Sequence, residues 1–349
     1  MRKKLFPKWS LSSINYLNYL AFFGNMMNKR KVFITSDVFS TELQRLSPTH
    51  FEVKVHHDSQ SKLTEEELIN IGNNYDYVIA NLTNKFTKRV LDASERLKLI
   101  SNIAVGYDNI DISAATQNKI YVTTTPETLH QSVAEFTVGL LLMATKNVSF
   151  HQKKHSSGQY PRWSPTFGLG VELFQKEIGI IGLGQIGQEI GRILHFGFGC
   201  KINYLKNKNK YDPDFPVTAY SKDEFFKTQK IIIISCPLTK ETRGLIGKKE
   251  IAQMPLDTTL INIARGEIID QEELIKNHHK FIAIGLDVTN PDPLPNNHQL
   301  LKMEKIFITP HIASATKEAR LKMVATAIDN IITHEQGGEK VLKNYVNNF

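Results

Sequence analysis

Short runs of β-branched and apolar residues alternate with amphipathic segments along most of this chain, beginning at Lys31. In the first part, we expect strands at residues 32–35, 51–55, 77–80, 97–100 and 120–123. A helix is predicted over residues 64–71, because Thr64 can cap its N-terminus and Glu67 follows three residues later. Strands that alternate with helices in this way are typical of a parallel sheet.

The alternation changes near Pro126, where a long amphipathic helix is predicted over about residues 129–147. We expect this helix to lead from one domain into the next. The residues predicted on its apolar side are Val133, Phe136, Leu140, Leu141 and Met143.

A second series of strands is expected at residues 201–205, 231–235, 258–263, 281–288 and 306–309. The four isoleucines at 231–234 show no polar alternation, as expected of a strand that helices cover on both faces. The last predicted helix, residues 316–334, is long enough to return to the first domain. The pattern therefore predicts an α/β fold with two doubly wound parallel-sheet domains, the second inserted into the first.

A glycine-rich motif opens the second series, directly after the apolar residues 177–181. Gly182, Gly184 and Gly187 have the G-x-G-x-x-G spacing, and a helical pattern follows them. The first glycine permits a tight turn, the second lets the backbone approach a phosphate, and the third allows close packing of helix on strand. The spacing alone is weak evidence, but a strand before it and a helix N-terminus after it predict a Rossmann-type site for a dinucleotide pyrophosphate.

Polar side chains follow three later predicted strands, where functional residues collect on this kind of scaffold. Arg265 follows the strand at 258–263, Asp287 and Asp292 flank the loop after the next strand, and His311 follows the last. A ketone that accepts a hydride needs a group that polarises its carbonyl and an acid that protonates its oxygen, and arginine and histidine suit these tasks. A carboxylate beside the histidine would favour the protonated imidazole. Each residue alone could be structural, but together they predict a ketone-reducing site.

The first strand after the glycines bears on the choice of cofactor. NAD-specific sites place an acidic residue about 20 residues after the glycines, where it binds the ribose 2′-hydroxyl. Here residues 202–205 end without a carboxylate and continue into Lys206, Asn207 and Lys208. Since ammonium groups could attract a 2′-phosphate, we predict that NADP(H) is preferred and that NAD(H) is possible. A solvated basic loop is the alternative.

The composition, 41% hydrophobic and 22% charged over 349 residues, is ordinary for a globular protein of about two domains. Two cysteines, Cys200 and Cys236, are too few for a disulfide framework or a metal cage, so no metal is predicted. The net charge of +8 is concentrated at the start of the chain, where seven basic residues precede the first acidic residue, Asp37. The other 36 basic and 35 acidic residues nearly cancel, so no nucleic-acid partner is expected.

Residues 1–28 are basic, contain serines and lack acidic residues, as mitochondrial transit peptides do. Their apolar stretch is short and is interrupted by Asn15 and Asn18, so no membrane span is predicted. We expect a disordered extension on a cytoplasmic protein, with mitochondrial targeting as the alternative. The predicted division is residues 1–28 as this extension, 29–127 with 318–349 as a substrate-binding domain, and 128–317 as the dinucleotide-binding domain.

Five motifs occur in order along the second half: Gly182-Leu-Gly-Gln-Ile-Gly187, Cys236-Pro-Leu-Thr239, Asn262-Ile-Ala-Arg-Gly266, Gly285-Leu-Asp-Val-Thr289 and Pro310-His-Ile-Ala-Ser-Ala-Thr316. Together with residues 101–111 of the first part, this ordered set resembles the D-isomer-specific 2-hydroxyacid dehydrogenases. The resemblance covers nearly all of the chain after the N-terminal extension. Residues 287–295, followed by Asn297 and His298, resemble the glyoxylate reductase/hydroxypyruvate reductase branch of that family. The fold that this resemblance implies is a Rossmann coenzyme domain inserted in a flavodoxin-like substrate domain.

The resemblance implies a role for each matching residue. Arg265 would bind the carboxylate and carbonyl of a small 2-keto or 2-hydroxy acid, and His311 would be the acid/base. The backbone N–H groups of Val105 and Gly106 would grip the substrate carboxylate, and Asp287 would hold the nicotinamide carboxamide. The predicted cofactor-binding residues are Gly182, Gly184, Gln185, Ile186, Gly187, Lys206, Asn207, Cys236, Pro237, Thr242, Ala264, Asp287, His311 and Ser314.

Trp163 lies in a segment that, in this branch, resembles a loop reaching the substrate pocket of a neighbouring subunit. A buried aromatic anchor is the alternative for this residue. A homodimer is expected from the resemblance.

One residue departs from the family's pattern. The carboxylate partner of the histidine is usually glutamate, but Asp292 occupies that position here. Its side chain is shorter by roughly 1.5 Å, and a misplacement of about 1 Å can cost on the order of a hundredfold in rate. We predict that Asp292 still pairs with His311, because Pro291 and Pro293 can set a different loop position.

The sequence therefore predicts NADPH-preferring reduction of glyoxylate and hydroxypyruvate to glycolate and D-glycerate. A dehydrogenase for another D-2-hydroxyacid is one alternative. The other is a dinucleotide-sensing binding protein whose catalysis is weakened, which the shortened Asp292 would favour.

Overall fold

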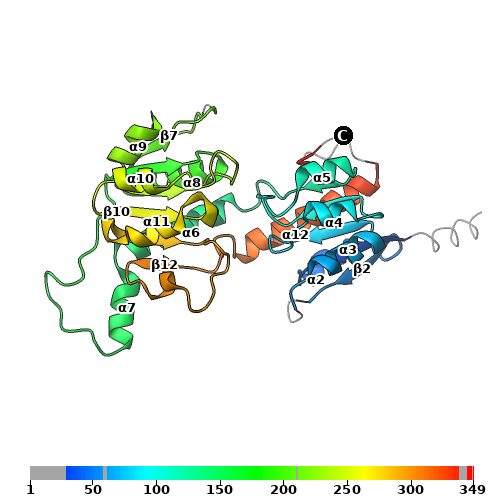
Figure 1. Cartoon of the computed structure of the whole chain (residues 1–349), viewed down its shortest axis with the longest axis horizontal. Helices are drawn as coiled ribbons and strands as arrows, with labels where there is room; N and C mark the ends of the chain where they lie inside the picture. Colours follow the sequence, from blue (N-terminus) through cyan, green and yellow to red (C-terminus); the bar gives the residue numbers. More distant parts are fainter. Residues whose placement is uncertain (1–28, 58–60, 210, 338–343, 348) are drawn as a thin grey trace, which may run out of the picture. The chain divides into compact units, whose positions relative to one another are not determined.

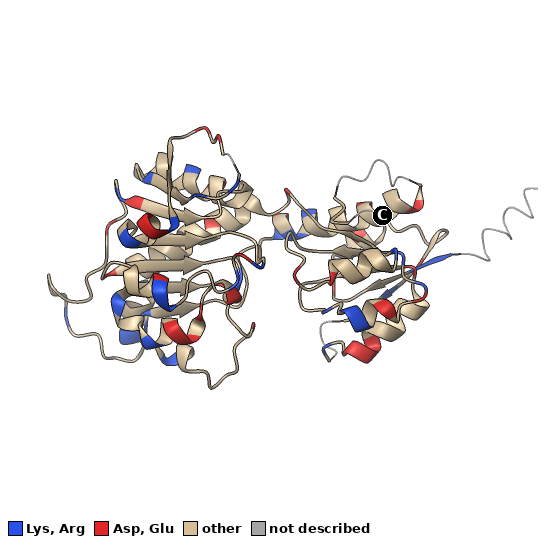
Figure 2. Cartoon of the chain, turned by 45° about the horizontal axis from the view of Figure 1, so that its top comes forward, with Lys and Arg blue, Asp and Glu red and all other residues tan. Residues whose placement is uncertain are grey.

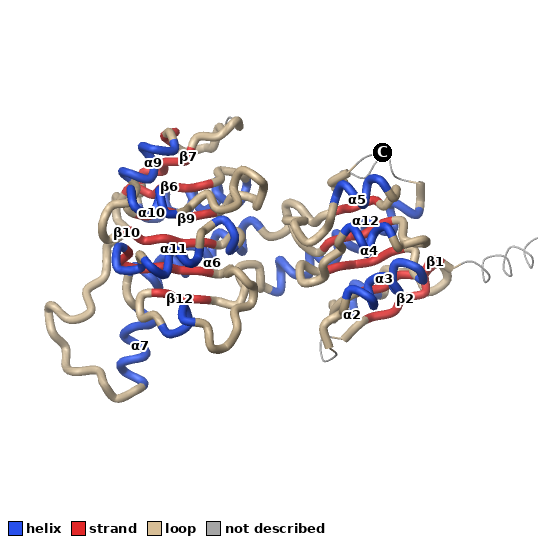
Figure 3. The backbone as a smooth tube through the Cα atoms, viewed as in Figure 1, coloured by secondary structure: helices blue, strands red, loops and turns tan. Residues whose placement is uncertain are grey.

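The computed structural model describes residues 29–57, 61–209, 211–337, 344–347 and 349, so the predicted extension at 1–28 lies outside the described residues. Contacts divide the chain into two compact units, one formed by residues up to Pro126 and from Leu321 onward, the other by Glu127–Arg320. The boundaries predicted after residues 127 and 317 lie one and three residues from these. Each unit contains one all-parallel sheet with helices, which confirms the predicted fold class (Figure 3).

The sheet of the first unit has five strands in the order β2-β1-β3-β4-β5 (Figure 1). The strands are β1 (Arg30–Ile34), β2 (Phe51–Val55), β3 (Tyr77–Ala80), β4 (Leu99–Asn102) and β5 (Tyr121–Thr123). The helices are α2 (Ser40–Leu43), α3 (Glu65–Asn74), α4 (Lys88–Asp92), α5 (Ile112–Gln117) and the larger part of α12 (Lys317–Glu335). Thr64 caps α3 and forms the predicted capping box with Glu67. Buried side chains of α3, α4 and α5 pack with the strands in one cluster.

The last helix returns to the first unit, as predicted. In α12, Asn330 donates from Nδ2 to the Thr124 carbonyl oxygen (3.2 Å) and to Ser101 Oγ (3.4 Å). The Ser101 hydroxyl in turn donates to the Ala327 carbonyl oxygen (2.9 Å). These buried bonds tie the helix to the ends of β4 and β5, and β4 leads into the predicted substrate loop.

The sheet of the second unit has seven strands in the order β12-β11-β10-β9-β6-β7-β8. The strands are β6 (Glu177–Ile181), β7 (Lys201–Leu205), β8 (Val217–Tyr220), β9 (Ile231–Ile234), β10 (Thr258–Asn262), β11 (Phe281–Leu286) and β12 (Ile306–Ile308). The α-helices are α6 (His130–Thr145), α7 (Val148–Ser156), α8 (Gln185–Phe198), α9 (Lys222–Thr228), α10 (Lys248–Gln253) and α11 (Gln271–Lys276). Short 3₁₀ turns are Gly266–Ile268, His278–Lys280 and Gln299–Lys302.

Helices cover both faces of this second sheet. α6 packs on α8 and crosses β10 and β11, whereas α10 contacts both α9 and α11 on the opposite side (Figure 1). All four residues of β9 are completely or almost completely buried, which confirms the prediction from its unbroken run of isoleucines. β9 lies beside β6, at the point where the order of the strands reverses. Ligands of doubly wound sheets bind at such a point, outside the carboxyl ends of the strands.

The predicted helix over residues 129–147 differs from the structure in two respects. Asn147 adopts a left-handed φ of 53°, which separates α6 from α7 and ends the first helix at Thr145. Met143, predicted on the apolar side, is 39% exposed, whereas Leu140, Leu141 and Ala144 are buried. The inward stripe of α6 therefore does not include Met143.

Positions of Lys or Arg and positions of Asp or Glu both occur along the ribbon of each unit (Figure 2). Within the described residues, no single helix is both long and apolar enough to cross a bilayer, although α6 and α7 reach that composition together as a pair bent by 62°.

Candidate active site and dinucleotide-binding loops

Each glycine of the motif after β6 has its own physical reason. Gly182 has a φ of 95°, and a Cβ there would lie 2.6 Å from the Cys236 backbone. A Cβ on Gly187 would overlap the carbonyl oxygen of Gly182, so the third glycine lets α8 start close to the strand. A Cβ on Gly184 would meet open space. The open side of Gly184 is where a ligand can approach the backbone.

The start of α8 can hold an anion. Gly184 is the N-cap residue and gives no side-chain cap, so the first N–H groups of the helix, beginning at Gln185 and Ile186, keep their donors for a ligand. The helix is long enough, at 14 residues, for its dipole to favour a negative charge there. The residues present therefore fit the pyrophosphate of a dinucleotide.

The loop after β9 faces this glycine turn. Ser235 Oγ donates to the Gly182 carbonyl oxygen (2.7 Å), and Cys236 follows it. Burial raises the pKa of the Cys236 thiol to about 11, so this cysteine stays neutral and is no nucleophile. Thr242 donates from its hydroxyl to the Pro237 carbonyl oxygen (2.7 Å) and thereby shapes the loop. Their roles in cofactor binding stay predictions.

β7 ends at Leu205 without a carboxylate, and the exposed Lys206 and Asn207 follow. Lys206 N–H donates to the Tyr220 carbonyl oxygen (2.9 Å), which extends the pairing with β8 by one residue. The pKa of Glu241 is lowered mainly by its hydrogen bond from Thr239, with a smaller contribution from Lys208. Lys208 therefore lies near the loop after β9, at the same end of the sheet as the glycine turn.

The side chain of Asn262 shapes the turn that carries Arg265. This fully buried asparagine, the last residue of β10, donates from Nδ2 to the Arg265 carbonyl oxygen (2.8 Å) and accepts from the Ala264 N–H (3.0 Å). The chain then enters a 3₁₀ turn at Gly266, with Arg265 as its N-cap residue. The guanidinium is partly exposed, and its Nη1 donates to the Ala264 carbonyl oxygen (2.8 Å).

Gly266 lets the arginine turn lie directly against the next loop. An added Cβ would overlap the carbonyl group of Thr289 and would lie 2.7 Å from the Asn290 nitrogen. The two loops are therefore in contact through their backbones.

His311 occupies a strained turn after β12, with a φ of 56°. Its N–H donates to the Asp287 carbonyl oxygen (2.9 Å). The Asp287 carboxylate accepts from the N–H groups of Ile312 and Ala313 (2.9 Å each). It also accepts from Thr309 Oγ1 (2.7 Å). Asp287 thus holds the histidine turn, and its predicted contact with the nicotinamide carboxamide stays a prediction.

Asp287 is completely buried, and burial raises the pKa of its carboxyl above the ordinary value. Its three hydrogen bonds and the nearby His311 oppose that shift.

Asp292 reaches His311 despite its shorter side chain. His311 Nδ1 lies 2.7 Å from Asp292 Oδ2, and both side chains are partly exposed. An imidazole that engages a carboxylate through Nδ1 leaves Nε2 to exchange a proton with a substrate. The predicted pair is present, and its catalytic role stays a prediction. Within the described ranges, no group of three or more His, Cys, Asp or Glu side chains is placed to hold a metal ion.

Val105 and Gly106 follow β4 in the first unit. The preceding residues are held by two backbone bonds, from Ile103 N to the Ala80 carbonyl oxygen (2.8 Å) and from Thr125 N to the Ala104 carbonyl oxygen (2.9 Å). Val105 is 40% exposed, and no acceptor within the described part of the chain is assigned to its N–H or to that of Gly106. These two donors are therefore able to bind a carboxylate.

Trp163 lies in the long segment between α7 and β6 and is 81% exposed. The alternative of a buried aromatic anchor is therefore wrong, because the side chain packs into no core of its own chain. Its predicted contact with a neighbouring subunit stays a prediction.

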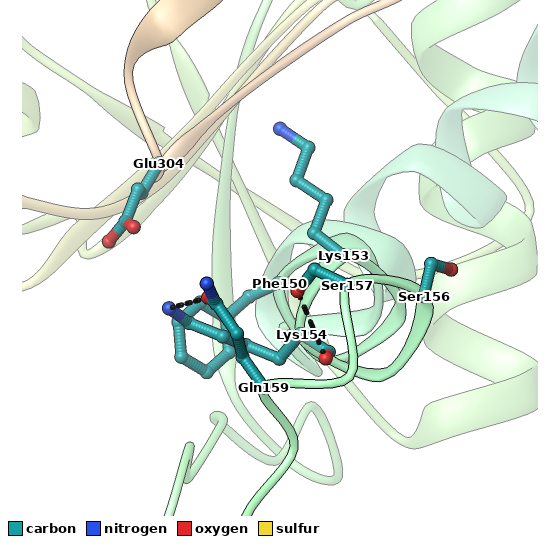
Figure 4. A pocket seen from close by; sticks show the side chains of 7 residues that line it. All are labelled: Phe150, Lys153, Lys154, Ser156, Ser157, Gln159 and Glu304. Carbon is teal, nitrogen blue, oxygen red and sulfur yellow. Dashed lines mark hydrogen bonds between the residues drawn. The ribbon is translucent and has the colours of Figure 1, made fainter.

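A hollow of about 520 Å³ beside α7 holds none of the predicted site residues (Figure 4). Phe150, Lys153, Lys154 and Gln159 line it from α7 and the segment that follows, and Glu304 stands opposite. Lys154 Nζ donates a hydrogen bond to Gln159 Oε1 (3.4 Å). The candidate site is therefore defined by the loops after the strands and not by this hollow.

Comparison with known proteins supports the family that these loop motifs predict. Residues 138–313 match the family model described as "D-isomer specific 2-hydroxyacid dehydrogenase, NAD binding domain". The chain belongs to the D-isomer-specific 2-hydroxyacid dehydrogenase family. Its cofactor is accordingly a nicotinamide dinucleotide, and the predicted family is confirmed.

Relatives match the dehydrogenase over almost its whole length. Glyoxylate reductase of Thermofilum pendens is 38% identical over 317 residues, which cover 89% of this chain and 93% of the relative. Glyoxylate reductase of Aeropyrum pernix is 35% identical over 329 residues, which cover 92% and 97%. The crystal structure of the TT0316 protein from Thermus thermophilus superposes with a TM-score of 0.83 at 30% identity and covers 91% of this chain and 100% of that chain.

The sequence pattern did not indicate three residues that shape the dehydrogenase's loops. Asn262 could have been found, because an asparagine that ends a strand often bonds the backbone two or three residues later. The other two, Thr309 and Gln271, form hydrogen bonds with segments distant in sequence, and no local signal marks them.

The remaining predicted cofactor residues, Ala264 and Ser314, lie in the loops after β10 and β12.

Proposed function

We propose that this dehydrogenase reduces glyoxylate and hydroxypyruvate to glycolate and D-glycerate, and that it prefers NADPH to NADH. The observation that carries the proposal is the hydrogen bond between His311 and Asp292 at the same edge of the sheet as Arg265. That edge then presents an acid and a carboxylate clamp together. Two glyoxylate reductases among the relatives support the choice of substrate.

Held at the glycine turn and the start of α8, a nicotinamide dinucleotide would supply the hydride for reduction of the keto acid's carbonyl carbon. Arg265 binds the substrate carboxylate with its guanidinium and polarises the carbonyl. Negative charge develops on the carbonyl oxygen, and Nε2 of His311 donates a proton to it. Asp292 holds the ring through Nδ1 and stabilises the protonated imidazole.

The cofactor preference rests on the residues after β7. Leu205 ends the strand where NAD-specific sites have an acid, so no carboxylate repels a 2′-phosphate. Lys206 is exposed beside it, and Lys208 lies near the loop after β9. The surplus positive charge at this position favours the phosphorylated cofactor.

Initial rates of NADPH and NADH oxidation with glyoxylate, hydroxypyruvate and a branched, bulkier 2-keto acid test this function. We expect kcat/KM to be at least about tenfold higher with NADPH, since a lost phosphate contact costs of the order of 1.5 kcal/mol or more. The Lys206→Ala variant should raise KM for NADPH more than for NADH, whereas Lys227→Ala, in the exposed part of α9, should change neither.

The outcomes distinguish the alternatives. Equal kcat/KM for both cofactors rejects the preference for NADPH. Faster turnover of the bulkier acid supports a dehydrogenase for another D-2-hydroxyacid. Saturable dinucleotide binding without oxidation in the presence of any keto acid supports the dinucleotide-sensing protein.

The dehydrogenase is further proposed to be a homodimer in which Trp163 reaches the substrate pocket of the neighbouring subunit. The indole is 81% exposed, and Leu169 in the same segment is 65% exposed. Exposed apolar side chains of this size support a surface that a second subunit covers. We expect a dimer in sedimentation-velocity runs, and a KM for glyoxylate that rises about tenfold in Trp163→Ala, because a buried aromatic contact is typically worth about 1.4 kcal/mol or more. A monomer with an unchanged KM in the variant would contradict the proposal.

A further inference from the structure

Gln271, the first residue of α11, clamps the loop that carries Asp292. Its side-chain Nε2 donates to the Asn290 carbonyl oxygen (2.6 Å), and its Oε1 accepts from the Asn290 N–H (3.0 Å). One amide group therefore satisfies both backbone groups of one residue, as a neighbouring strand would. Asn290 is exposed and lies two residues before Asp292, so these two bonds hold an exposed part of the loop in addition to its backbone contact with Gly266.

The N-terminus of α11, where Gln271 lies, is itself held in place by several contacts. Asp270 caps α11 by accepting from the Glu273 N–H (3.1 Å), and its own N–H donates to the Ile246 carbonyl oxygen (2.9 Å). Leu274, one turn further on, is buried in the core of the second unit. The backbone of Gln271 is thus fixed from two sides.

The start of α11, which holds Gln271, belongs to the same segment of the chain as Arg265. Only the 3₁₀ turn Gly266–Ile268 and the single residue Ile269 lie between Arg265 and Asp270. Gly266 already touches the backbone of Thr289 and Asn290. The position of the Asp292 loop is therefore set relative to the arginine turn by this backbone contact and by the Gln271 amide.

Asp292 has little tolerance for movement, because its side chain is short. Its Oδ2 atom is 2.7 Å from His311 Nδ1, and a displacement of about 1 Å would break that hydrogen bond. We propose that Gln271 is a positioning residue for the reduction: its amide fixes Asn290 and thereby keeps Asp292 within hydrogen-bonding distance of His311. This inference rests on the proposed function of His311 as the acid.

A double-mutant cycle with Gln271→Ala and Asp292→Asn tests the inference in the full-length enzyme. We expect Gln271→Ala to lower kcat between about threefold and a hundredfold while KM for glyoxylate changes less than about twofold, because Arg265 keeps its turn. In the Asp292→Asn background the same change should lower kcat less than about twofold, since no carboxylate remains to be positioned. The basic limb of the pH profile of kcat should move to lower pH in Gln271→Ala, as in Asp292→Asn.

Two further variants separate positioning from general stability. Gln271→Glu keeps the length and the acceptor but places a carboxylate against the Asn290 carbonyl oxygen, so it should resemble Gln271→Ala. Glu272→Ala alters the adjacent exposed residue of the same helix and should leave kcat and the pH profile unchanged. A loss of the same factor in both backgrounds, or an unchanged kcat in Gln271→Ala, overturns the inference.

A spectroscopic readout keeps the inference apart from the proposed function. In ¹⁵N-histidine-labelled protein, the imidazole N–H signal that disappears in His311→Ala reports the bond to Asp292. It should weaken or shift in Gln271→Ala and stay in place in Glu272→Ala, and its persistence unchanged in Gln271→Ala overturns the inference. If the unmutated protein reduces no keto acid, the proposed function fails, while this signal still decides whether Gln271 positions Asp292.

Discussion

Replacing His311 with alanine is expected to lower kcat for glyoxylate reduction by about 10²- to 10⁴-fold, the usual contribution of a positioned general acid. The structure leaves Nε2 as the nitrogen that can reach a substrate, because Nδ1 is bonded to Asp292. KM should change less than kcat, since the substrate carboxylate is bound elsewhere. Steady-state rates across pH in the alanine variant and in Asp292→Asn measure both effects.

The Asp292→Asn variant should keep part of the activity, with the basic limb of its pH profile moved to lower pH. An amide cannot stabilise the imidazolium that donates the proton, so the active form is lost at lower pH. The carboxyl of Asp287, which also interacts with His311, is unaltered in this variant. His279→Ala changes an exposed histidine in the 3₁₀ turn before β11, at the opposite end of that strand from Asp287, and should match the unmutated enzyme. Retention of more than about a tenth of kcat in His311→Ala would remove the histidine from the mechanism.

Replacing Gly266 with alanine is the second change for which a large effect is expected. The new methyl group would overlap the Thr289 carbonyl and press on Asn290, and neither backbone group can rotate out of the way. Overpacking of this kind costs about 1–3 kcal/mol of unfolding free energy. Because the displaced loop carries Asp292, kcat should also fall by about a hundredfold.

Gly197→Ala is a matched control for this change. Gly197 lies in α8, has nothing within 4 Å of its would-be Cβ, and has no positive φ. Alanine there should leave kcat unchanged and stabilise the protein by up to about 1 kcal/mol, since glycine weakens a helix interior. Urea unfolding and steady-state kinetics of both variants are compared. Equal stability and activity of Gly266→Ala and Gly197→Ala would show that the loops are not in close contact.

Local patterns were sufficient for most of the fold. The strand at 77–80 and the capped helix after Thr64 were predicted from alternation and from a capping box, and both are present. Errors occur where the signal is not local. Leu97 and Lys98 were predicted in a strand that begins at Leu99, and the predicted helix at 129–147 is interrupted by the left-handed conformation of Asn147.

The residue types of the candidate site were predictable from the sequence, but the hydrogen bonds that hold those residues in position were not. The carboxylate at position 292 and the histidine at 311 could be paired by their place after neighbouring strands. The bonds that make the pair possible, from Gln271 to Asn290 and from Asp287 to the turn after Pro310, join segments 19 or more residues apart. No periodicity reports such contacts.

The sequence by itself determined the two parallel sheets, the dinucleotide loop and the residue types at the strand ends, because these follow from periodicity, glycine spacing and order along the chain. Only the tertiary structure decided that Asp292 reaches His311, that the Asp287 carboxylate holds the histidine turn, and that Trp163 is exposed. The physical reason is that these features depend on how segments remote in sequence are placed relative to one another, and a hydrogen bond tolerates a displacement of well under about 1 Å. Such placement is set by the packing of whole loops.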